Sequence, residues 1–128
     1  MKNSGIDNRY YAIDTFSGFV KEDIEYEQKN RGKGNSYRSF RKNKKKWFDG
    51  TLQQNGINDV ISVEADINTY DLSCHYPISV ALLDVDLYRP MKMGLPNIYQ
   101  GLASGGIIIV DDCDENDDRW DGSDQAYK

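Results

Sequence analysis

The chain has 128 residues, of which 38% are hydrophobic and 29% are charged, and its formal net charge is −5. This profile is typical of one globular domain and excludes a large multidomain enzyme. With one histidine and two cysteines, the sequence also excludes a multi-histidine metal centre and a disulfide framework. The longest apolar runs, 80–83 and 107–110, are far shorter than the roughly 20 residues of a membrane-spanning helix, so we expect no membrane partner. The polar residues 1–9 predict a cytoplasmic protein with free thiols.

Basic and acidic residues are segregated along the chain. Residues 29–46 hold nine of the 16 basic residues and no acid, while residues 111–128 hold eight of the 21 acids. Tyr37, Phe40 and Trp47 lie in or beside the basic segment, a mixture that suits stacking on bases and contact with phosphates. Runs of like charge are more often solvated loops or exposed helix faces. We therefore interpret residues 29–46 in that way and expect no nucleic-acid partner.

The chain begins with a predicted strand that ends at an acid. A short β-prone run at 10–13 precedes Asp14 and a turn rich in serine and glycine. Residues 20–34 are charged and weakly periodic, so no core element is expected there. The glycine-bearing stretch 31–36 predicts a flexible loop.

A helix and a second strand follow in the prediction. Apolar side chains at helical spacing from Phe40 to Leu52 predict an amphipathic helix, and the Asn55-Gly56 pair is its stop signal. The run 60–65 predicts a strand that ends at Asp66, which repeats the pattern of the first strand.

The second half of the chain continues this order of strand, acid, loop and helix. The run 78–84 is almost continuously apolar and predicts a strand covered on both faces, as in a parallel sheet. Residues 90–102 have helical spacing and precede a glycine stop at 104–106. A fourth predicted strand, 107–110, runs directly into Asp111. The repeated order predicts an α/β fold with a mostly parallel sheet and flanking helices.

Carboxylates follow all four predicted strands. Because the carboxyl ends of parallel strands meet at one edge of a sheet, Asp14, Asp66, Asp84 and Asp111 are expected to lie together. Asp84, Asp111 and Asp112 are the candidate metal ligands, since carboxylate oxygens suit Mg²⁺, Mn²⁺ or Ca²⁺. Helix capping is the alternative role for one or two of these acids.

Individual residues carry further interpretations. Asp14 is positioned to accept hydrogen bonds from ribose hydroxyls or to form a turn, and Asp66 to meet an adenine amino group or to form an Asx-turn. Asp86 is interpreted as a helix cap, because the chain should be leaving the sheet at that point. His75 is expected to be structural and Cys113 to be a small buried residue.

Three segments, IDTFSGF, ALLDVDLYRPMKMGLPNIYQGLASGGIIIVDDC and WDGSDQAY, together resemble the macrocin O-methyltransferase family over residues 10–127. The resemblance implies a Rossmann-like fold, S-adenosylmethionine and Mg²⁺ as cofactors, and a hydroxyl of a sugar or other polyhydroxylated small molecule as acceptor. It places Asp14 near the adenosyl ribose and Asp66 near the adenine. It makes Asp84, Asp111 and Asp112 the metal ligands, with Asp84 also the catalytic base near the acceptor hydroxyl.

The resemblance also implies elements that this chain lacks. The family's first strand and its glycine-rich loop would precede Tyr10, and its last strands would follow Tyr127. We therefore expect residues 1–128 to form a single partial methyltransferase domain, with a gap between the family's second and fourth strands where the first strand lies. A different closure of the sheet, a homo-oligomer or a complementing chain would fill the gap. The alternative function is an inactive remnant or split subunit that acts through partner binding.

Overall fold

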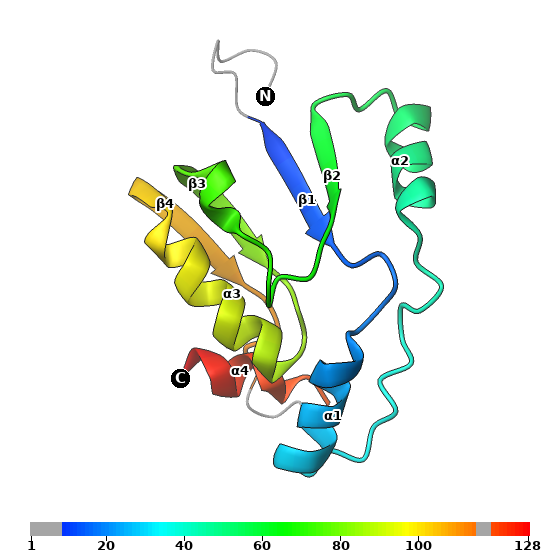
Figure 1. The fold of residues 1–128 in the computed structure, drawn as a ribbon. Helices are drawn as coiled ribbons and strands as arrows, with labels where there is room; N and C mark the ends of the chain where they lie inside the picture. Colours follow the sequence, from blue (N-terminus) through cyan, green and yellow to red (C-terminus); the bar gives the residue numbers. More distant parts are fainter. Residues whose placement is uncertain (1–8, 115–118) are drawn as a thin grey trace.

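Two pairs of parallel strands organise the computed structural model, which describes residues 9–114 and 119–128 (Figure 1). Strand β1 (Tyr10–Asp14) pairs with β2 (Val60–Glu64). Strand β3 (Ile78–Leu83) pairs with β4 (Leu102–Val110). All four arrows point toward the same end of the molecule, and β1 and β3 are the inner strands of the two pairs. The expected α/β fold is confirmed, and the sheet is divided at the place where the expected gap lies.

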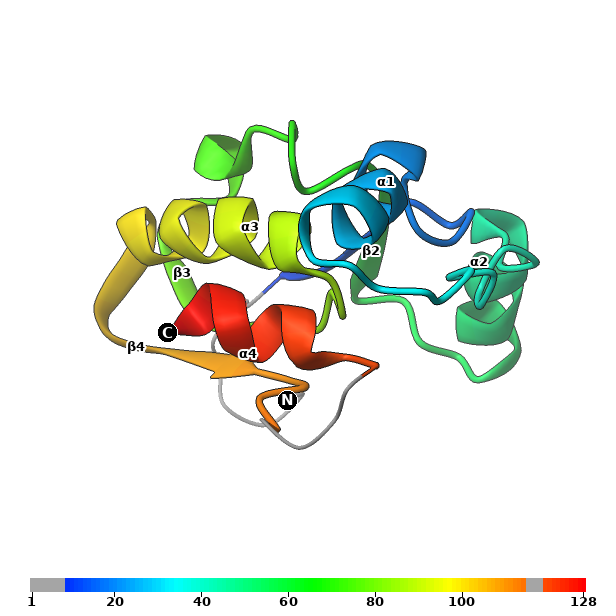
Figure 2. The ribbon, with the colours of Figure 1, turned by 90° about the horizontal axis from the view of Figure 1, so that it is seen from below.

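Helices connect and cover the strands. They are α1 (Lys21–Asn30) and α2 (Lys45–Gln54) between β1 and β2, the short 3-10 helix η1 (Leu72–His75), α3 (Tyr88–Gln100) between β3 and β4, and α4 (Asp121–Tyr127). Figure 2 shows α3 and α4 side by side, and the two helices are in contact. In the part of the chain that the structure describes, no helix is long and apolar enough to cross a membrane.

Helix α1 shows that the expectation of no core element at 20–34 is wrong. Its buried side chains are Asp23 and Glu27, which are 3% and 1% exposed. Acids in the first turn and Lys29 in the last turn oppose the helix dipole, which favours the helix locally. Since the buried positions are charged, apolar periodicity gave no signal of this helix.

The core lies between α3 and the β3–β4 pair. Leu83 from β3 packs with Met91 and Ile98 from α3, which lie on one helix face at a spacing of seven residues. A Cβ added to Gly94 would lie 3.0 Å from Ile67 Cγ1, so a glycine there lets α3 approach its neighbours closely. Ala126 brings α4 into the same cluster.

Two helix boundaries differ from the prediction. Helix α2 begins at Lys45 rather than near Phe40, because Phe40 lies in a turn with a positive φ of 64°. The glycine stop expected at 104–106 lies inside β4, where the register against β3 shifts. Gly105 has a φ of 78° there, a conformation that glycine adopts without strain.

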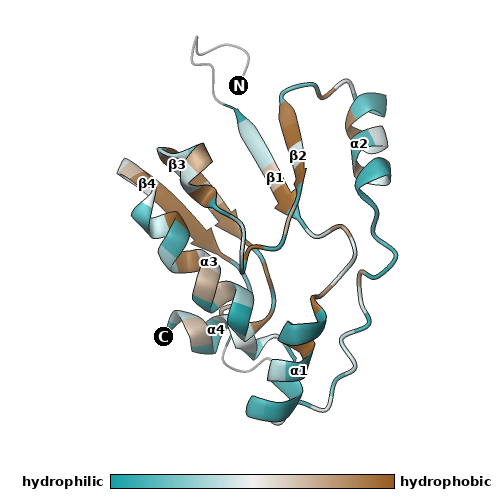
Figure 3. Cartoon of the chain, in the orientation of Figure 1, coloured by the Kyte–Doolittle hydropathy of each residue, from teal (hydrophilic) through white to brown (hydrophobic). Residues whose placement is uncertain are grey.

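The other face of the β3–β4 pair is open, which corrects the expectation of strands covered on both faces. Side chains alternate along each strand, so the residues next to those that meet α3 point away from it. Val80, Leu82, Ile107 and Ile109 are 64%, 59%, 57% and 52% exposed. Figure 3 shows the hydrophobic character of both strands.

Candidate functional site

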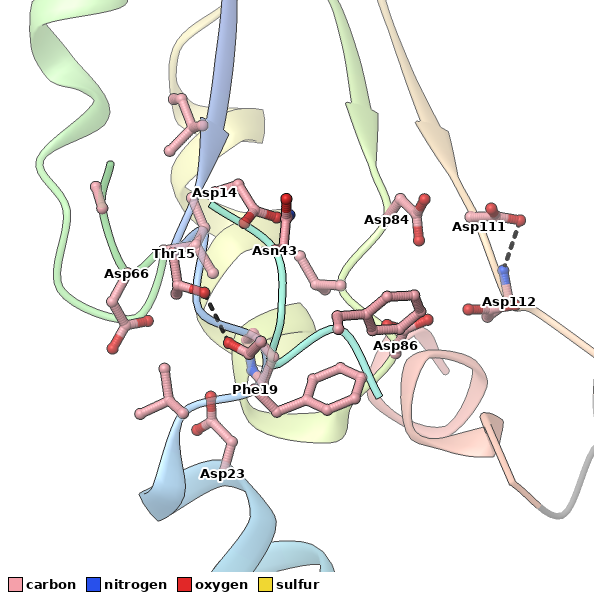
Figure 4. Close-up of a pocket in the computed structure, with 18 of the residues that line it drawn as sticks. Asp14, Thr15, Phe19, Asp23, Asn43, Asp66, Asp84, Asp86, Asp111 and Asp112 are labelled. Atoms are coloured by element: carbon pink, nitrogen blue, oxygen red, sulfur yellow. Dashed lines mark hydrogen bonds between the residues drawn. The ribbon is translucent and has the colours of Figure 1, made fainter. Parts of the chain in front are cut away.

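The carboxyl ends of the strands open into one cavity of about 460 Å³ (Figure 4). Asp14 is the last residue of β1, and Asp66 lies in the turn after β2. Asp84 directly follows β3, and Asp111 directly follows β4. All four residues line the cavity. The expectation that these four acids share one edge of the fold is therefore met. The cavity extends from the β1–β2 pair to the β3–β4 pair.

The tightest group of acids differs from the predicted one. Asp84, Asp86 and Asp112 each place a carboxylate oxygen within 4.8 Å of the others, so we call these three residues the acid triad. Asp111 lies beside the triad, and its Oδ1 accepts a hydrogen bond of 2.9 Å from the Asp112 amide. The predicted residues Asp84, Asp111 and Asp112 therefore lie at one edge of the fold. Within the closest group of carboxylates, however, the third member is Asp86 and not Asp111.

Asp86 is not a helix cap, contrary to the prediction. The residue that precedes α3 is Leu87, and no side chain caps the helix there. Asp86 and Asp112 adopt positive φ values of 57° and 54°. Aspartate tolerates this left-handed conformation better than most residues, and strained backbone of this kind is common at functional sites. These turns redirect the chain after β3 and after β4, and the two side chains meet.

Burial and neighbouring carboxylates disfavour the ionised forms of Asp84 and Asp86. Burial and a hydrogen bond with Asp112 raise the pKa of Asp86 to about 8. Burial, and then repulsion by Asp111, Asp112 and Asp14, raises the pKa of Asp84. Carboxylates gathered in this way are stabilised by a cation that neutralises them.

On the β1–β2 side of the cavity, Asp14 and Asp66 form Asx-type turns. Turn formation was the alternative role expected for both residues. Asp14 Oδ1 accepts a hydrogen bond from the Phe16 amide. Asp66 Oδ1 accepts from the Asn68 amide at 2.9 Å and from Asn68 Nδ2 at 2.8 Å. Each interaction uses one oxygen of the carboxylate while the residue lines the cavity.

A partly buried hydrogen-bond network holds Asp66. Asn68 Nδ2 also donates to Asp23 Oδ2 at 2.9 Å, and Arg89 Nη1 donates to Asp23 Oδ1 at 2.9 Å. Burial raises the pKa of Asp23, although its partners Asn68 and Arg89 oppose the shift. Asp23 lines the cavity and was missed by sequence reasoning, because a lone acid on a charged helix carries no distinguishing signal.

Aromatic side chains form one wall of the cavity. Phe19, Phe40 and Trp120 line it, and the Phe19 ring lies 5.7 Å from Phe40 and 5.8 Å from Trp120 between centroids. Tyr37 packs edge-on against Phe19 at 6.0 Å and is 2% exposed. Since Tyr37 and Phe40 belong to the basic segment, that segment helps to build the cavity.

The interpretation of the whole basic segment as solvated is wrong for Arg31 and Lys33. Arg31 forms ion pairs with Glu27 and with Asp121, the latter at 3.0 Å, and its side chain is 8% exposed. Lys33 Nζ lies 2.8 Å from Asp121 Oδ2. These two basic residues therefore join α1 to α4.

The histidine and the two cysteines are outside the cavity lining. His75 is outside the cavity lining, as expected of a structural residue, and its Nε2 lies 2.9 Å from the Tyr70 hydroxyl. Cys74 and Cys113 are free thiols, as predicted. Cys113 is exposed rather than buried, because it follows β4 in the segment that leaves the sheet.

No protein-family model and no curated protein matches the chain. Its fold resembles the solved structure of the calicheamicin methyltransferase CalS11 with a TM-score of 0.69 and 24% identity over 93% of this chain and 50% of that one. An apo structure of CalS11, described as a TDP-rhamnose 3′-O-methyltransferase, aligns with a TM-score of 0.59 and 22% identity over 93% of this chain and 48% of that one. The chain therefore has a methyltransferase-like fold and spans about half the length of these structures.

Proposed function

We propose that this chain carries the catalytic edge of an S-adenosylmethionine-dependent O-methyltransferase. The proposed acceptor is a hydroxyl of a sugar or other polyhydroxylated small molecule, as the resemblance to the macrocin O-methyltransferase family implies. The observation that carries the proposal is the convergence of four strand-end carboxylates in one cavity. The fold likeness to CalS11, whose description names a sugar O-methyltransferase, supports it.

Asp14 and Asp66 would hold the adenosine part of the cofactor. Their Asx-type hydrogen bonds fix both carboxylates at the cavity wall, and carboxylate oxygens accept hydrogen bonds from ribose hydroxyls and from the adenine amino group. The aromatic wall that includes Phe19 and Phe40 offers apolar surface of the kind that binds flat rings. The hydrogen-bond acceptors and the apolar wall on this side therefore fit a nucleoside.

The acid triad fits a hard divalent cation. Its three carboxylates bring oxygens within 4.8 Å of one another, and their mutual repulsion is relieved by a positive charge. We assign Asp84, Asp86 and Asp112 as ligands of Mg²⁺, and Asp111 as a fourth carboxylate whose charge adds to the field of the site.

Asp84 is the proposed catalytic base. When bound, S-adenosylmethionine supplies an electrophilic methyl group for an acceptor oxygen, and Mg²⁺ lowers the pKa of that hydroxyl. Asp84 would accept the hydroxyl proton, since its carboxylate lines the cavity beside the proposed cation.

Calorimetric titration with S-adenosylhomocysteine, with and without Mg²⁺, tests this function on a chain first shown by circular dichroism to be folded. We expect binding that weakens in the Asp14→Asn and Asp66→Asn variants. The matched control is Asp59→Asn, because Asp59 is an exposed acid outside the cavity. A folded chain that binds no S-adenosylhomocysteine in either buffer contradicts the proposal.

A second candidate is a split subunit that acts through a partner. The observation that favours it is the division of the strands into two separate pairs. Binding of S-adenosylhomocysteine by the isolated chain separates the first candidate from this one.

A further inference from the structure

The first residue of α3, Tyr88, is held by side chains of α1 and of the residue that follows it. The Tyr88 amide donates a hydrogen bond of 2.8 Å to Glu27 Oε1. The Tyr88 ring stacks on the Tyr26 ring at 5.5 Å between centroids. The guanidinium of Arg31, directly after α1, lies 5.6 Å from the centre of the Tyr88 ring. Three contacts from one part of the chain therefore fix the start of α3.

A glycine of α4 confines the same peptide group. Gly122 is buried, and a Cβ added to it would lie 2.6 Å from the Tyr88 nitrogen and 3.0 Å from the Leu87 carbonyl carbon. Such a close approach to backbone atoms requires a residue without a side chain. The Leu87–Tyr88 peptide is therefore held against both α1 and α4, which both contact α3 (Figure 2).

The turn before this peptide is strained and carries a member of the acid triad. The Leu87 amide donates to the Val85 carbonyl, and Asp86 between them has a φ of 57°. A hydrogen bond of this kind across a residue with a positive φ defines the less common form of γ-turn, which is strained. Strained backbone persists where the surrounding structure over-determines it. Glu27 and Gly122 do so here, because they hold the peptide that follows the turn.

The direction of the Asp86 side chain follows from this turn. With the turn in place, its carboxylate lies within 4.8 Å of those of Asp84 and Asp112. A change from left-handed to extended backbone would redirect the Cβ and separate the carboxylates. We propose that Glu27 is a positioning residue for the acid triad, because it fixes the peptide after Asp86 and so keeps the three carboxylates together. The inference rests on the proposed function of the triad as a cation site.

Glu27 is suited to this role because both of its carboxylate oxygens have partners. Oε1 accepts from the Tyr88 amide, and Oε2 accepts from Arg31, which also pairs with Asp121 at 3.0 Å. The side chain is buried, so movement away from these partners would leave an uncompensated charge in the interior. The acceptor for the Tyr88 amide is therefore fixed in place.

A double-mutant cycle of Mn²⁺ affinity, measured by calorimetry on folded variants, tests the proposal. Glu27→Leu removes the acceptor for the Tyr88 amide and should weaken Mn²⁺ binding by about tenfold, no more than Asp86→Asn does. In the Asp86→Asn background, the same substitution should change the affinity by less than about twofold, because no carboxylate remains at that position. An equal loss in both backgrounds, or no loss in the parent background, overturns the proposal.

Two further variants separate positioning from a general loss of stability. Gly122→Ala places a methyl group against the Leu87–Tyr88 peptide and should weaken Mn²⁺ binding although Glu27 is intact. Ile98→Val removes a buried methyl group near the other end of α3 and should leave the affinity unchanged. If Ile98→Val weakens Mn²⁺ binding as much as Gly122→Ala does, stability alone explains the effect and the proposal is wrong. Gly122→Ala also replaces Glu27→Leu in the cycle if the latter does not fold.

Backbone NMR tests the same contact without a cation. In the parent chain, the Tyr88 amide should be protected from hydrogen exchange, and the carbon chemical shifts of Asp86 should be those of a left-handed residue. In Glu27→Leu, the Tyr88 amide should exchange about tenfold faster or more, and the Asp86 shifts should move. If these results hold but the parent chain binds no Mn²⁺, the proposed cation site fails while Glu27 still positions Asp86. A Tyr88 amide that exchanges rapidly in the parent chain overturns the positioning role, whether or not Mn²⁺ binds.

Discussion

Asp86 is the residue that most separates the observed acid triad from the predicted one, and the difference is testable. If Asp86 is a metal ligand, Asp86→Asn and Asp112→Asn should each weaken Mn²⁺ binding by about tenfold or more in calorimetry. Asp111→Asn should have a smaller effect, because Asp111 lies outside the triad. Asp59→Asn should have none. The reverse order, with Asp111→Asn the more damaging, would restore the ligand set expected from the sequence.

Loss of folding does not explain such a result for Asp86. Its pKa is raised to about 8 by burial and by the hydrogen bond with Asp112, so the ionised side chain is unfavourable without a cation. The amide of asparagine is neutral, so the variant does not bear the free-energy cost of burying an ionised side chain. We therefore expect the metal-free Asp86→Asn protein to be at least as stable as the parent chain in thermal unfolding, while it binds the cation less tightly.

Much of the candidate site was accessible from the sequence because strand ends are easy to locate. Apolar runs place Asp84 and Asp111 at the ends of two strands, and parallel topology brings them to one edge. The approach of Asp86 to Asp84 and Asp112 was not accessible, because it depends on a left-handed turn with a φ of 57°. Sequence alone does not distinguish such a turn from a capping position, since aspartate is common in both.

Asn68 offers a second prediction at the scale of single residues. It donates hydrogen bonds to both Asp66 and Asp23, so it positions the carboxylate proposed to meet the adenine. Asn68→Ala should weaken S-adenosylhomocysteine binding by about fivefold, since a hydrogen bond to a charged group contributes about 1 kcal/mol or more. Mn²⁺ affinity should be unchanged. Asn58→Ala, which removes an exposed asparagine, is the control.

At the scale of elements, the attachment of α4 depends on Asp121. Its carboxylate pairs with Arg31 and Lys33, and although burial opposes the shift, these partners lower the pKa of Asp121. Asp121→Asn should reduce the free energy of unfolding by about 1–3 kcal/mol at neutral pH, because it removes the carboxylate charge that pairs with these two partly buried cations. Glu25→Gln, in a surface pair with Lys29, should change it little.

The pH dependence of this effect has a definite sign. Because the pKa of Asp121 is lower in the folded than in the unfolded chain, its contribution is present above about pH 4 and is lost as the pH falls through the folded value. The difference in urea unfolding between the parent chain and Asp121→Asn should therefore shrink from about pH 7 to about pH 3. A difference that stays constant over this range would show that Asp121 acts through packing rather than charge.

Elements were predictable where burial is apolar and not where it is polar. The run at 78–84 and the spacing of Met91 and Ile98 predicted β3 and α3, because both meet the core through hydrocarbon. Helix α1 escaped prediction since its buried positions, Asp23 and Glu27, are held by ion pairs and hydrogen bonds with residues distant in the sequence. No local pattern encodes those partners.

At the scale of the whole molecule, the open face of the β3–β4 pair should control self-association. Val80 and Ile107 are 64% and 57% exposed on neighbouring strands, and contiguous exposed apolar surface promotes association. The double variant Val80→Lys, Ile107→Lys should therefore bind less of a hydrophobic dye and show a smaller rise of weight-average mass with concentration in sedimentation. Its free energy of unfolding should stay within about 0.5 kcal/mol of the parent value, because both side chains are exposed.

A substitution on the opposite face separates surface exposure from a general loss of stability. Leu83 is 3% exposed and packs against α3, so Leu83→Ala should lower the free energy of unfolding by about 2–5 kcal/mol. At concentrations and temperatures where this variant remains folded, its mass should depend on concentration as that of the parent chain does, because the open face is intact. If the double lysine variant associates as strongly as the parent, the contacts lie elsewhere. The strand edges that are unpaired among the described residues then become the next surface to test, because an edge pairs through backbone groups that side-chain substitution leaves in place.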